Sequence, residues 1–432
     1  MLKRKFTDYL KQWKATKQKE CLLVCGARQI GKTFIIEDFA RNNYESFVEL
    51  NFEQFPVLKS AFDGELTVEE MIKRISVFIP SARFIPHKTL IFFDEIQSCP
   101  QARTSLKFWA IDDTFDVIAS GSLLGVNYKA VSSFPVGYER QVNMYSLDFE
   151  EYLWAVGLSD DVISSLREHF INRSKIDDAV HIKMMEYLRE YMVVGGMPAV
   201  VSQFVATKNF GIVQQEQEKI IAAYLNDIAK YAESTDRVKA RSCFLSVPRQ
   251  LVKDNTKFQY SVVEHNGTAR KFGNSLDWLR DAGIVAYCYN LSTLQFPLSA
   301  YVRDDQFRIY LTDIGLLVSM YGFEMKAALL TDALSGPAKG GIFENLMADI
   351  LHKKKLPLYF YKKDDSSMEI EFVLTQDAKP LPIEVKSKKG RTQSLNTALT
   401  WSGIEQGYKF GKYNVGVDGK KVTMPIYMAM FL

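Results

Sequence analysis

The hydrophobic pattern of the first 155 residues alternates short apolar runs with helical segments. The apolar runs are nearly continuous, which is typical of strands covered on both faces of a parallel sheet. The segments predicted as strands are Glu20–Cys25, Phe47–Asn51, Thr89–Phe93, Asp116–Ala119 and Gln141–Tyr145. Helical spacing separates them, as in Lys32–Arg41 and Val68–Ile79. This rhythm predicts an α/β fold with a parallel sheet.

The pattern becomes helical from Phe149 to Tyr231, with one break at Gly195-Gly196-Met197-Pro198. A further helix is predicted over Thr268–Ala282, where the apolar residues Phe272, Leu276 and Leu279 share a face. Two predicted strands, Ile284–Tyr289 and Phe307–Leu311, follow this helix. A helix followed by a hairpin in this order resembles a winged helix.

The small, glycine-rich and proline-containing stretch Ala333–Gly341 predicts a linker. A last α+β unit is expected from Gly341 to Leu432. Its predicted elements are the helix Ile342–Leu351, the strands Leu358–Tyr361, Glu369–Leu374 and Leu381–Lys386, and the helix Ser394–Trp401.

Length and composition narrow the class of protein. A chain of 432 residues has room for two to four domains, and 47% apolar with 24% charged residues is ordinary for a soluble globular protein. The net charge of +3 argues against a chain coated for bulk binding to nucleic acid or membranes. Residues 340–432 hold 14 Lys and Arg against 10 Asp and Glu, so the excess positive charge lies in the C-terminal part.

Cysteine use and the N-terminus indicate the compartment. The five cysteines are an odd number scattered along the chain, which favours a reducing cytosol over a disulfide framework. Met1–Lys17 is charged and lacks the apolar core of a signal peptide. The apolar stretch Tyr191–Val205 is too short and too broken by glycine and proline to span a bilayer. We therefore expect a cytoplasmic protein that makes no membrane contact.

A phosphate-binding motif, GxxxxGKT, follows the first predicted strand and opens a helix. Glycines let backbone N–H groups wrap a β-phosphate, and the helix N-terminus adds a favourable dipole. Lys32 is expected to bridge the β- and γ-phosphates of ATP, and the Thr33 hydroxyl to ligate Mg²⁺. The predicted nucleotide-binding residues here are Gly26, Ala27, Arg28, Gln29, Ile30, Gly31, Lys32, Thr33 and Phe34.

A second motif, LIFFDE, is an apolar strand that ends in two acids, Asp94 and Glu95. Asp94 at the strand's end is expected to hold Mg²⁺ opposite Thr33, and Glu95 to polarise the attacking water as a general base. An acidic strand end alone is common, but its position after the GxxxxGKT motif favours ATP hydrolysis. The pair is also typical of the ATP-hydrolysing branch of P-loop proteins, in which an extra strand lies between these two strands. Asp116–Ala119 fits that strand, and Ser120 or Ser122 is then the candidate sensor of the γ-phosphate.

Together with Ser146-Leu147-Asp148-Phe149-Glu150-Glu151 and Gly195-Gly196-Met197-Pro198, these motifs resemble the AAA-type ATPases of prokaryotes. In that family the ATPase is fused to a C-terminal domain of unknown function similar to restriction endonucleases. The resemblance covers nearly the whole chain. It implies an ATPase core at residues 1–157, a helical lid at 158–235, a winged-helix-like domain at 236–325, a linker at 326–340 and a nuclease-like domain at 341–432.

One position departs from the family. Relatives often place a basic residue directly after the glycine that corresponds to Gly137, whereas this sequence has Tyr138. Arg140 lies two residues further on and is an alternative, so the sequence does not identify an arginine finger.

The C-terminal unit carries four residues in the pattern of PD-(D/E)XK nucleases. Glu344 lies on the predicted helix, Glu371 on one strand, and Glu384 and Lys386 two residues apart on the next, where their side chains share a face. In such sites two carboxylates, here Glu371 and Glu384, hold Mg²⁺, and the lysine orients or activates a water. The alternative is a solvated strand with Glu–Lys pairs.

The sequence therefore predicts an Mg²⁺-dependent ATPase whose nucleotide state controls a nuclease-like domain that acts on DNA. The competing interpretation is a nucleotide-dependent switch or assembly module, in which the C-terminal domain is inactive and only binds a partner. A protein partner or a homo-oligomer fits this second interpretation.

Overall fold

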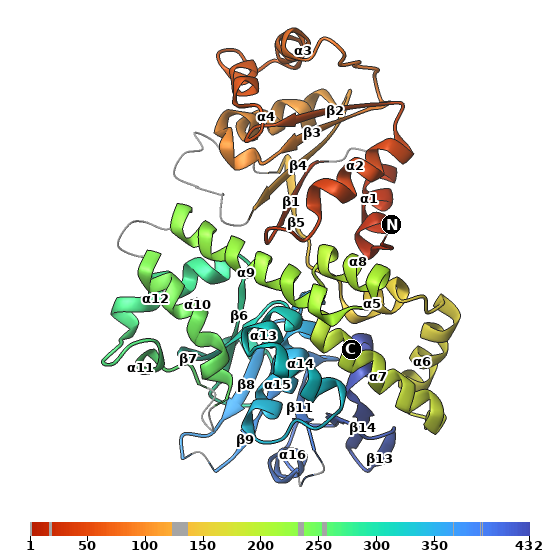
Figure 1. Cartoon of the computed structure of the whole chain (residues 1–432), viewed down its shortest axis with the longest axis vertical. Coiled ribbons are helices and arrows are strands. Elements are labelled where there is room, and N and C mark those ends of the chain that lie inside the picture. Colours follow the sequence, from red (N-terminus) through yellow and green to blue (C-terminus); the bar gives the residue numbers. More distant parts are fainter. Residues whose placement is uncertain are drawn as a thin grey trace. The chain divides into compact units, whose positions relative to one another are not determined.

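The computed structural model describes residues 2–16, 20–122, 137–231, 237–252, 257–365, 367–388, 390 and 392–432. The chain forms two compact units, Lys3–Tyr145 and Ser146–Leu432 (Figure 1). The nucleotide motifs lie in the first unit and the acidic C-terminal residues in the second.

The first unit is built around a five-stranded sheet in the order β2-β3-β4-β1-β5. Each neighbouring pair in this sheet is parallel, and β4 lies between β1 and β3, which confirms the predicted parallel core and the inserted strand. The strands are β1 Cys21–Gly26, β2 Ser46–Asn51, β3 Thr89–Asp94, β4 Asp116–Ser122 and β5 Glu139–Asn143. Every residue of β1 and β3 is buried, as their continuous apolar runs predicted.

The last strand begins earlier than predicted, at Glu139 rather than Gln141. Among the described residues β5 is an edge strand that pairs with β1, most of its positions are polar, and an apolar pattern does not mark its start.

Helices cover the sheet of the first unit (Figure 1). They are α1 Lys5–Ala15, α2 Lys32–Asn43, the 3₁₀ turn η1 Pro56–Phe62, α3 Val68–Phe78, the 3₁₀ turn η2 Ile96–Ser98 and α4 Pro100–Asp112. A hydrophobic core that includes Phe62, Met71, Phe93 and Trp109 lies under η1, α3 and α4. Phe93 stands edge-on to Phe62 and Trp109, with ring centroids 5.3 and 6.2 Å apart. This packing fixes β3, whose last residue is Asp94.

The second unit starts with the predicted helices and the predicted break. They are α5 Phe149–Ala155, α6 Asp160–Asn172, α7 Asp178–Val194, α8 Pro198–Thr207 and α9 Phe210–Tyr231. Asp148 and Glu151 form a reciprocal capping box at the start of α5. Gly195 ends α7 with a positive φ of 74°, and Pro198 occupies the first turn of α8, where its missing N–H costs nothing.

The middle of the second unit contains the expected helix and hairpin. Its elements are α10 Arg237–Leu251, α11 Tyr260–Val263, α12 Ala269–Asp281, β6 Val285–Leu291, η5 Leu298–Tyr301, β7 Val302–Leu311, α13 Ile314–Met320 and α14 Phe323–Leu330. Phe272, Leu276 and Leu279 are buried as predicted. The two strands are not an isolated hairpin, however, because β6 also pairs in parallel with β8 (Tyr359–Lys362). These strands and β9 (Glu369–Ile370) form a sheet ordered β7-β6-β8-β9.

The linker predicted over Ala333–Gly341 is wrong in its second half, because helix α15 (Pro337–Lys353) already begins at Pro337. The wider linker range 326–340 also includes the end of α14 (Phe323–Leu330). Among the glycines of Ala333–Gly341, Gly341 serves close packing, whereas a Cβ on Gly336 or Gly340 would meet nothing within 4 Å. A Cβ on Gly341 would lie 2.1 Å from the carbonyl oxygen of Leu251, so α15 and the end of α10 pack backbone to backbone.

The C-terminal strands form a second sheet, ordered β10-β11-β12-β14-β13. The remaining elements are β9 Glu369–Ile370, β10 Phe372–Gln376, β11 Lys379–Lys386, α16 Gln393–Ala398, β12 Gly407–Gly411, β13 Gly416–Asp418, β14 Lys421–Pro425 and η6 Ile426–Phe431. The strand predicted over Glu369–Leu374 is broken at Glu371. Ile370 pairs with Tyr361 in one sheet and Phe372 with Ile383 in the other, so the chain changes sheets at Glu371.

Among the helices of the described residues, none combines the length and the apolar character that a membrane span requires.

Candidate functional site

The nucleotide motif folds into a loop between β1 and α2 whose conformation requires its glycines. Gly31 caps α2 with φ of 89°, a left-handed conformation that favours glycine. A Cβ on Gly26 would lie 2.4 Å from the carbonyl oxygen of Met144. The loop therefore sits directly against the segment that follows β5.

Lys32 lies in the first turn of α2 with its side chain buried. Its Nζ donates to the carbonyl oxygens of Gly26 at 2.9 Å and Ala27 at 2.8 Å. Burial lowers the pKa of Lys32, and the carboxylate of Glu95 opposes this effect. The ammonium group is thus already directed into the loop, where an anionic phosphate would compensate its lost hydration.

Asp94 is the centre of the site and is only 2% exposed. The Thr33 hydroxyl lies 3.1 Å from its Oδ2, and the amide of Asn51 donates to the same oxygen at 2.9 Å. The Ser120 hydroxyl donates to Oδ1. Residues from β2, β3, β4 and α2 therefore converge on one buried carboxylate, at the carboxyl edge of the parallel sheet.

Glu95 follows directly, with a left-handed φ of 54° that turns the chain out of β3. Its carboxylate accepts a hydrogen bond from the Gln97 side-chain amide. Burial raises the pKa of Glu95, and the bond from Gln97 opposes the increase. A raised pKa suits a general base that works near neutral pH.

The structure brings Lys32, Thr33, Asp94, Glu95 and Ser120 together, as the sequence predicted. The side chain of Ser122 lies outside the described residues. Phe34 is 62% exposed, and Arg28 forms an ion pair with Glu53 at 3.8 Å. Gln29 takes a left-handed φ of 64°, and Ile30 is buried beneath the loop.

Sequence reasoning missed Asn51 and Gln97. Asn51 ends β2 in register with Asp94 at the end of β3, so a polar residue at the last position of the neighbouring strand was its only signal. Gln97 fits beside Gly121, where a Cβ would lie 2.9 Å from its Oε1.

Arg140 lies near the start of β5, away from the carboxyl ends of the strands, where Asp94 lies. It is in register with Leu22 in the first half of β1 and pairs with Glu20 at 2.8 Å. It therefore does not face the phosphate-binding loop of its own chain.

The four predicted C-terminal residues belong to two neighbouring groups of contacts, one around Lys386 and one around Arg308, and the charge of Glu344 contributes to the raised pKa of Glu371. We call these two groups together the acidic site. Lys386 Nζ lies 2.6 Å from Glu384 Oε1 and 3.3 Å from Glu371 Oε1. Glu344 accepts from Arg308 at 3.4 Å and from Tyr310 at 3.3 Å. Arg308 also bonds Glu369, which in turn pairs with Lys362 at 2.8 Å.

Burial dominates the electrostatics of this acidic site. It raises the pKa of Glu371 to about 8, against the opposing effect of Lys386 and with a further increase from Glu384. Burial would lower the pKa of Lys386, but Glu371 and Glu384 outweigh it and raise the value. Two carboxylate oxygens, Glu371 Oε2 and Glu384 Oε2, accept no hydrogen bond from any described residue, although the Glu384 side chain is only 4% exposed.

Arg308 and Glu369 were not predicted as site residues. Arg308 lies inside β7, and its contacts with Glu344 and Glu369 join segments far apart in the sequence. Within the described part of the chain, no three His, Cys, Asp or Glu side chains converge as a ready-made metal cage. Any cation here would rely on two carboxylates with backbone or water oxygens, as the prediction for Glu371 and Glu384 assumed.

One family model matches the part of the chain that contains the first site. Residues 18–153 match the family model described as AAA domain. The match and the geometry support an AAA-type P-loop ATPase. Residues 185–327 and 339–426 match two further models, both described as domains of unknown function (DUF8612 and DUF4143). A search of curated proteins gave no match.

Three solved structures resemble the chain. The Walker-type ATPase PABY2304 of Pyrococcus abyssi is 11% identical, covers 74% of this chain and 96% of its own, and has a TM-score of 0.43. The Aeropyrum pernix ORC1 protein in complex with DNA is 12% identical, with 76% and 92% covered and a TM-score of 0.27. PCH-2 of C. elegans is 14% identical, with 46% and 59% covered and a TM-score of 0.26. With TM-scores this low, the assignment rests on the family model and the site geometry.

The residues around Asp94 fit magnesium and a phosphate ligand such as ATP. Thr33 presents a hydroxyl and Asp94 a carboxylate on the same side of the loop, which are the oxygen ligands that Mg²⁺ prefers. Lys32 supplies the cation next to them. This donor set matches a phosphate-bound divalent cation rather than a transition metal.

Proposed function

We propose that the chain is an Mg²⁺-dependent ATPase whose phosphate site is formed by Lys32, Thr33 and Asp94. Bound Mg²⁺ would neutralise the phosphate oxygens and orient them. Lys32 exchanges its bonds to loop carbonyls for phosphate oxygens, while Thr33 and Asp94 hold the cation. Ser120 lies against Asp94 and reports the γ-phosphate.

In this proposal Glu95 is the general base. It takes a proton from water as the water oxygen attacks the γ-phosphorus and the bond to the ADP oxygen breaks. The hydrogen bond from Gln97 holds the Glu95 carboxylate until nucleotide is bound. The observation that carries the proposal is the convergence of Thr33, Asn51 and Ser120 on the buried Asp94 beside Lys32.

The test is the variant Glu95→Gln with Glu45→Gln as the matched control, since Glu45 is an exposed residue paired with Lys88. Glu95→Gln should bind ATP as tightly as wild type but lose turnover by about 10²–10⁴-fold, the usual contribution of a positioned base. Glu45→Gln should behave as wild type. Unchanged hydrolysis in Glu95→Gln would remove Glu95 from this role.

We also propose that the acidic site of the second unit binds a divalent cation and cleaves phosphodiesters in DNA, under the control of the ATPase. Glu371 and Glu384 would hold the cation, Lys386 would orient the attacking water, and Glu344 would complete the site. The supporting observation is the buried Glu384, whose Oε2 accepts no hydrogen bond from a described residue. Such an oxygen is costly to bury unless a ligand binds it.

Incubation with DNA, Mn²⁺ and ATP separates this function from the alternative of a binding module. Lys386→Ala should abolish cleavage, and Lys355→Ala, an exposed lysine at the end of α15, should not. Equal cleavage in wild type and Lys386→Ala, or none in either, would leave a nucleotide-dependent switch whose second unit binds DNA, a protein partner or another copy of the chain.

If both activities are present, residues 158–235 act as the helical lid of the ATPase and 236–325 as a winged-helix-like part. Residues 341–432 are then the nuclease-like part of a cytoplasmic protein.

A further inference from the structure

One guanidinium joins the phosphate-binding loop to the last residue of the first unit. Arg4 donates to the carbonyl oxygen of Ile30 in the loop at 3.3 Å and to that of Tyr145 at 2.7 Å. Met144 N–H donates to Cys25 at 2.8 Å, so the segment after β5 follows the edge of β1 up to the loop. The loop and Tyr145 therefore share one side chain as a hydrogen-bond donor.

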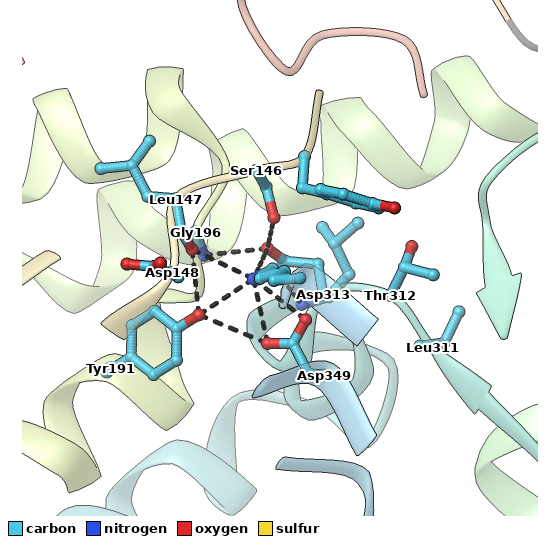
Figure 2. A network of polar contacts seen from close by, with 12 residues as sticks. Ser146, Leu147, Asp148, Tyr191, Gly196, Leu311, Thr312, Asp313 and Asp349 are labelled. Carbon is cyan, nitrogen blue, oxygen red and sulfur yellow. Dashed lines mark hydrogen bonds and ion pairs between the residues drawn. The ribbon is translucent and has the colours of Figure 1, made fainter. Parts of the chain in front are cut away.

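The next residue, Ser146, opens a buried polar cluster in the second unit (Figure 2). Its hydroxyl donates to Asp313 Oδ2 at 3.0 Å, and the same oxygen accepts from Gly196 N–H at 2.8 Å. Asp313 Oδ1 caps helix α13 through Leu316 N–H at 3.2 Å. We call Ser146, Tyr191, Gly196, Asp313, Asp349 and Lys353 the exit cluster.

Lys353, at the end of α15, holds the other side of the exit cluster. Its Nζ donates to the carbonyl oxygen of Leu147 at 3.0 Å, to Tyr191 at 2.9 Å and to Asp349 at 3.0 Å. The side chains of Asp313, Asp349 and Lys353 are all nearly inaccessible. Asp349 Oδ1 accepts no hydrogen bond from a described residue, although it lies within ion-pair distance of Lys353. Buried charges held in this way have few alternative arrangements, because a further lost bond leaves an uncompensated group.

The backbone segments that form the exit cluster pack so closely that no side chain fits between them. A Cβ on Gly196 would lie 2.0 Å from the carbonyl oxygen of Leu147, and one on Gly315 would lie 2.6 Å from Gly195. Leu147 N–H also donates to Gly196 at 2.7 Å. Residues 146–147, the break between α7 and α8, and the start of α13 are therefore in direct backbone contact.

Helix α15 and strand β7 connect the exit cluster with the acidic site. The Asn345 side chain bonds both backbone groups of Leu311, at 2.8 and 3.0 Å. Its neighbour Glu344 accepts from Arg308 and Tyr310 of the same strand. The strand and the helix thus meet both at Glu344 and, through Asp313 and Lys353, at the exit cluster.

We propose that Arg4 and the exit cluster form the coupling element through which bound nucleotide sets the position of α15, and with it Glu344 in the acidic site. The proposal rests on the ATPase function proposed above and adds its route of regulation. Coupling of this kind is a free-energy difference between two arrangements and acts equally in both directions.

Hydrogen exchange of the α15 amides tests the coupling in the full chain, with Mg²⁺ alone and with Mg²⁺ plus a non-hydrolysable ATP analogue. In wild type the analogue should change the exchange rates in α15 by about fivefold or more, the lower range of allosteric coupling. Arg4→Gln and Ser146→Ala should still bind the analogue but lose this change. Ser146→Ala removes one hydroxyl and no charge, so it preserves the fold where Asp313→Asn would endanger it.

Two exposed residues provide matched controls. Lys11→Gln removes a cation from α1, and Ser159→Ala removes a hydroxyl before α6 that makes no capping bond. Both should retain the wild-type response. Nucleotide binding without any change in α15 of wild type, or an unchanged response in both Arg4→Gln and Ser146→Ala, would overturn the coupling proposal alone. Absence of nucleotide binding would overturn the ATPase proposal and this one with it.

Discussion

The raised pKa of Glu371 predicts that the acidic site destabilises the second unit as the pH increases. Burial lifts this pKa from the ordinary 4.5 to about 8. Between these values the folded chain binds a proton that the unfolded chain has lost, so the free energy of unfolding falls as the pH rises. Above pH 8 the whole cost of the buried charge is present.

The size of the effect follows from the pKa difference. One pKa unit corresponds to about 1.4 kcal/mol, so the difference corresponds to roughly 5 kcal/mol as an upper limit. Glu371→Gln keeps the shape and an acceptor for Lys386 but cannot ionise. The variant should match wild type near pH 4.5 and exceed its unfolding free energy by about 2–5 kcal/mol at pH 8.5.

Native-state hydrogen exchange of the β10 and β11 amides, corrected for the intrinsic rate at each pH, measures this locally. Glu405→Gln is the control, because Glu405 is an exposed partner of Lys379. A Glu371→Gln variant that is equally or less stable than wild type at pH 8.5 would refute the reasoning. Mn²⁺ should stabilise wild type more at pH 8.5 than at pH 5.5, and this gain should vanish in the variant.

Three further predictions concern single contacts. Gln97→Ala should move the acid limb of the pH profile of kcat/KM for ATP hydrolysis to higher pH, because the bond from Gln97 lowers the pKa of Glu95. A kcat/KM profile unchanged from wild type would contradict this. Asn51→Ala should lower kcat/KM for Mg·ATP by about tenfold or more, through loss of one donor to a buried carboxylate, whereas the exposed Asn42→Ala should not. Gly341→Ala should destabilise the second unit by about 1–3 kcal/mol in urea unfolding, because the new Cβ would overlap the Leu251 carbonyl. Its neighbour Gly340→Ala, which meets nothing within 4 Å, should instead be neutral or stabilising, and equal effects at both positions would refute the packing argument.

Local patterns predicted the strands that carry the first site. The continuous apolar runs of β1 and β3 are buried throughout, and the motifs that follow them bring the Thr33 hydroxyl within contact of Asp94. Asn51 was not predicted as a site residue, because its contact with Asp94 depends on the register of β2 against β3, which no local pattern encodes. The contacts of Arg308 with Glu344 and Glu369 were not predicted either, because they join elements far apart in the sequence.

The break at Glu371 was hidden by a pattern that fits a continuous strand. Ile370 and Phe372 are both buried and Glu371 is not fully so, which is the alternation of a single half-buried strand. The change of sheets becomes visible only from the pairing partners, Tyr361 and Ile383. Likewise, the glycines before and at the start of α15 indicate flexibility in sequence, while in the fold Gly341 permits close packing of α15 against the end of α10.

The parallel pairing of β6 with β8 has a consequence for how this protein could be assembled in evolution. One of the two matched models of unknown function ends at residue 327, and the other begins at residue 339. Three residues of β6 nevertheless pair with three of β8 across that boundary: Tyr289, Asn290 and Leu291 with Tyr359, Phe360 and Tyr361. A gene fragment cut there would leave an unpaired, aromatic-rich strand edge on each half, which invites aggregation. The unit that can be inherited, duplicated or grafted onto another ATPase is therefore the shared sheet with both flanking segments, and neither segment by itself.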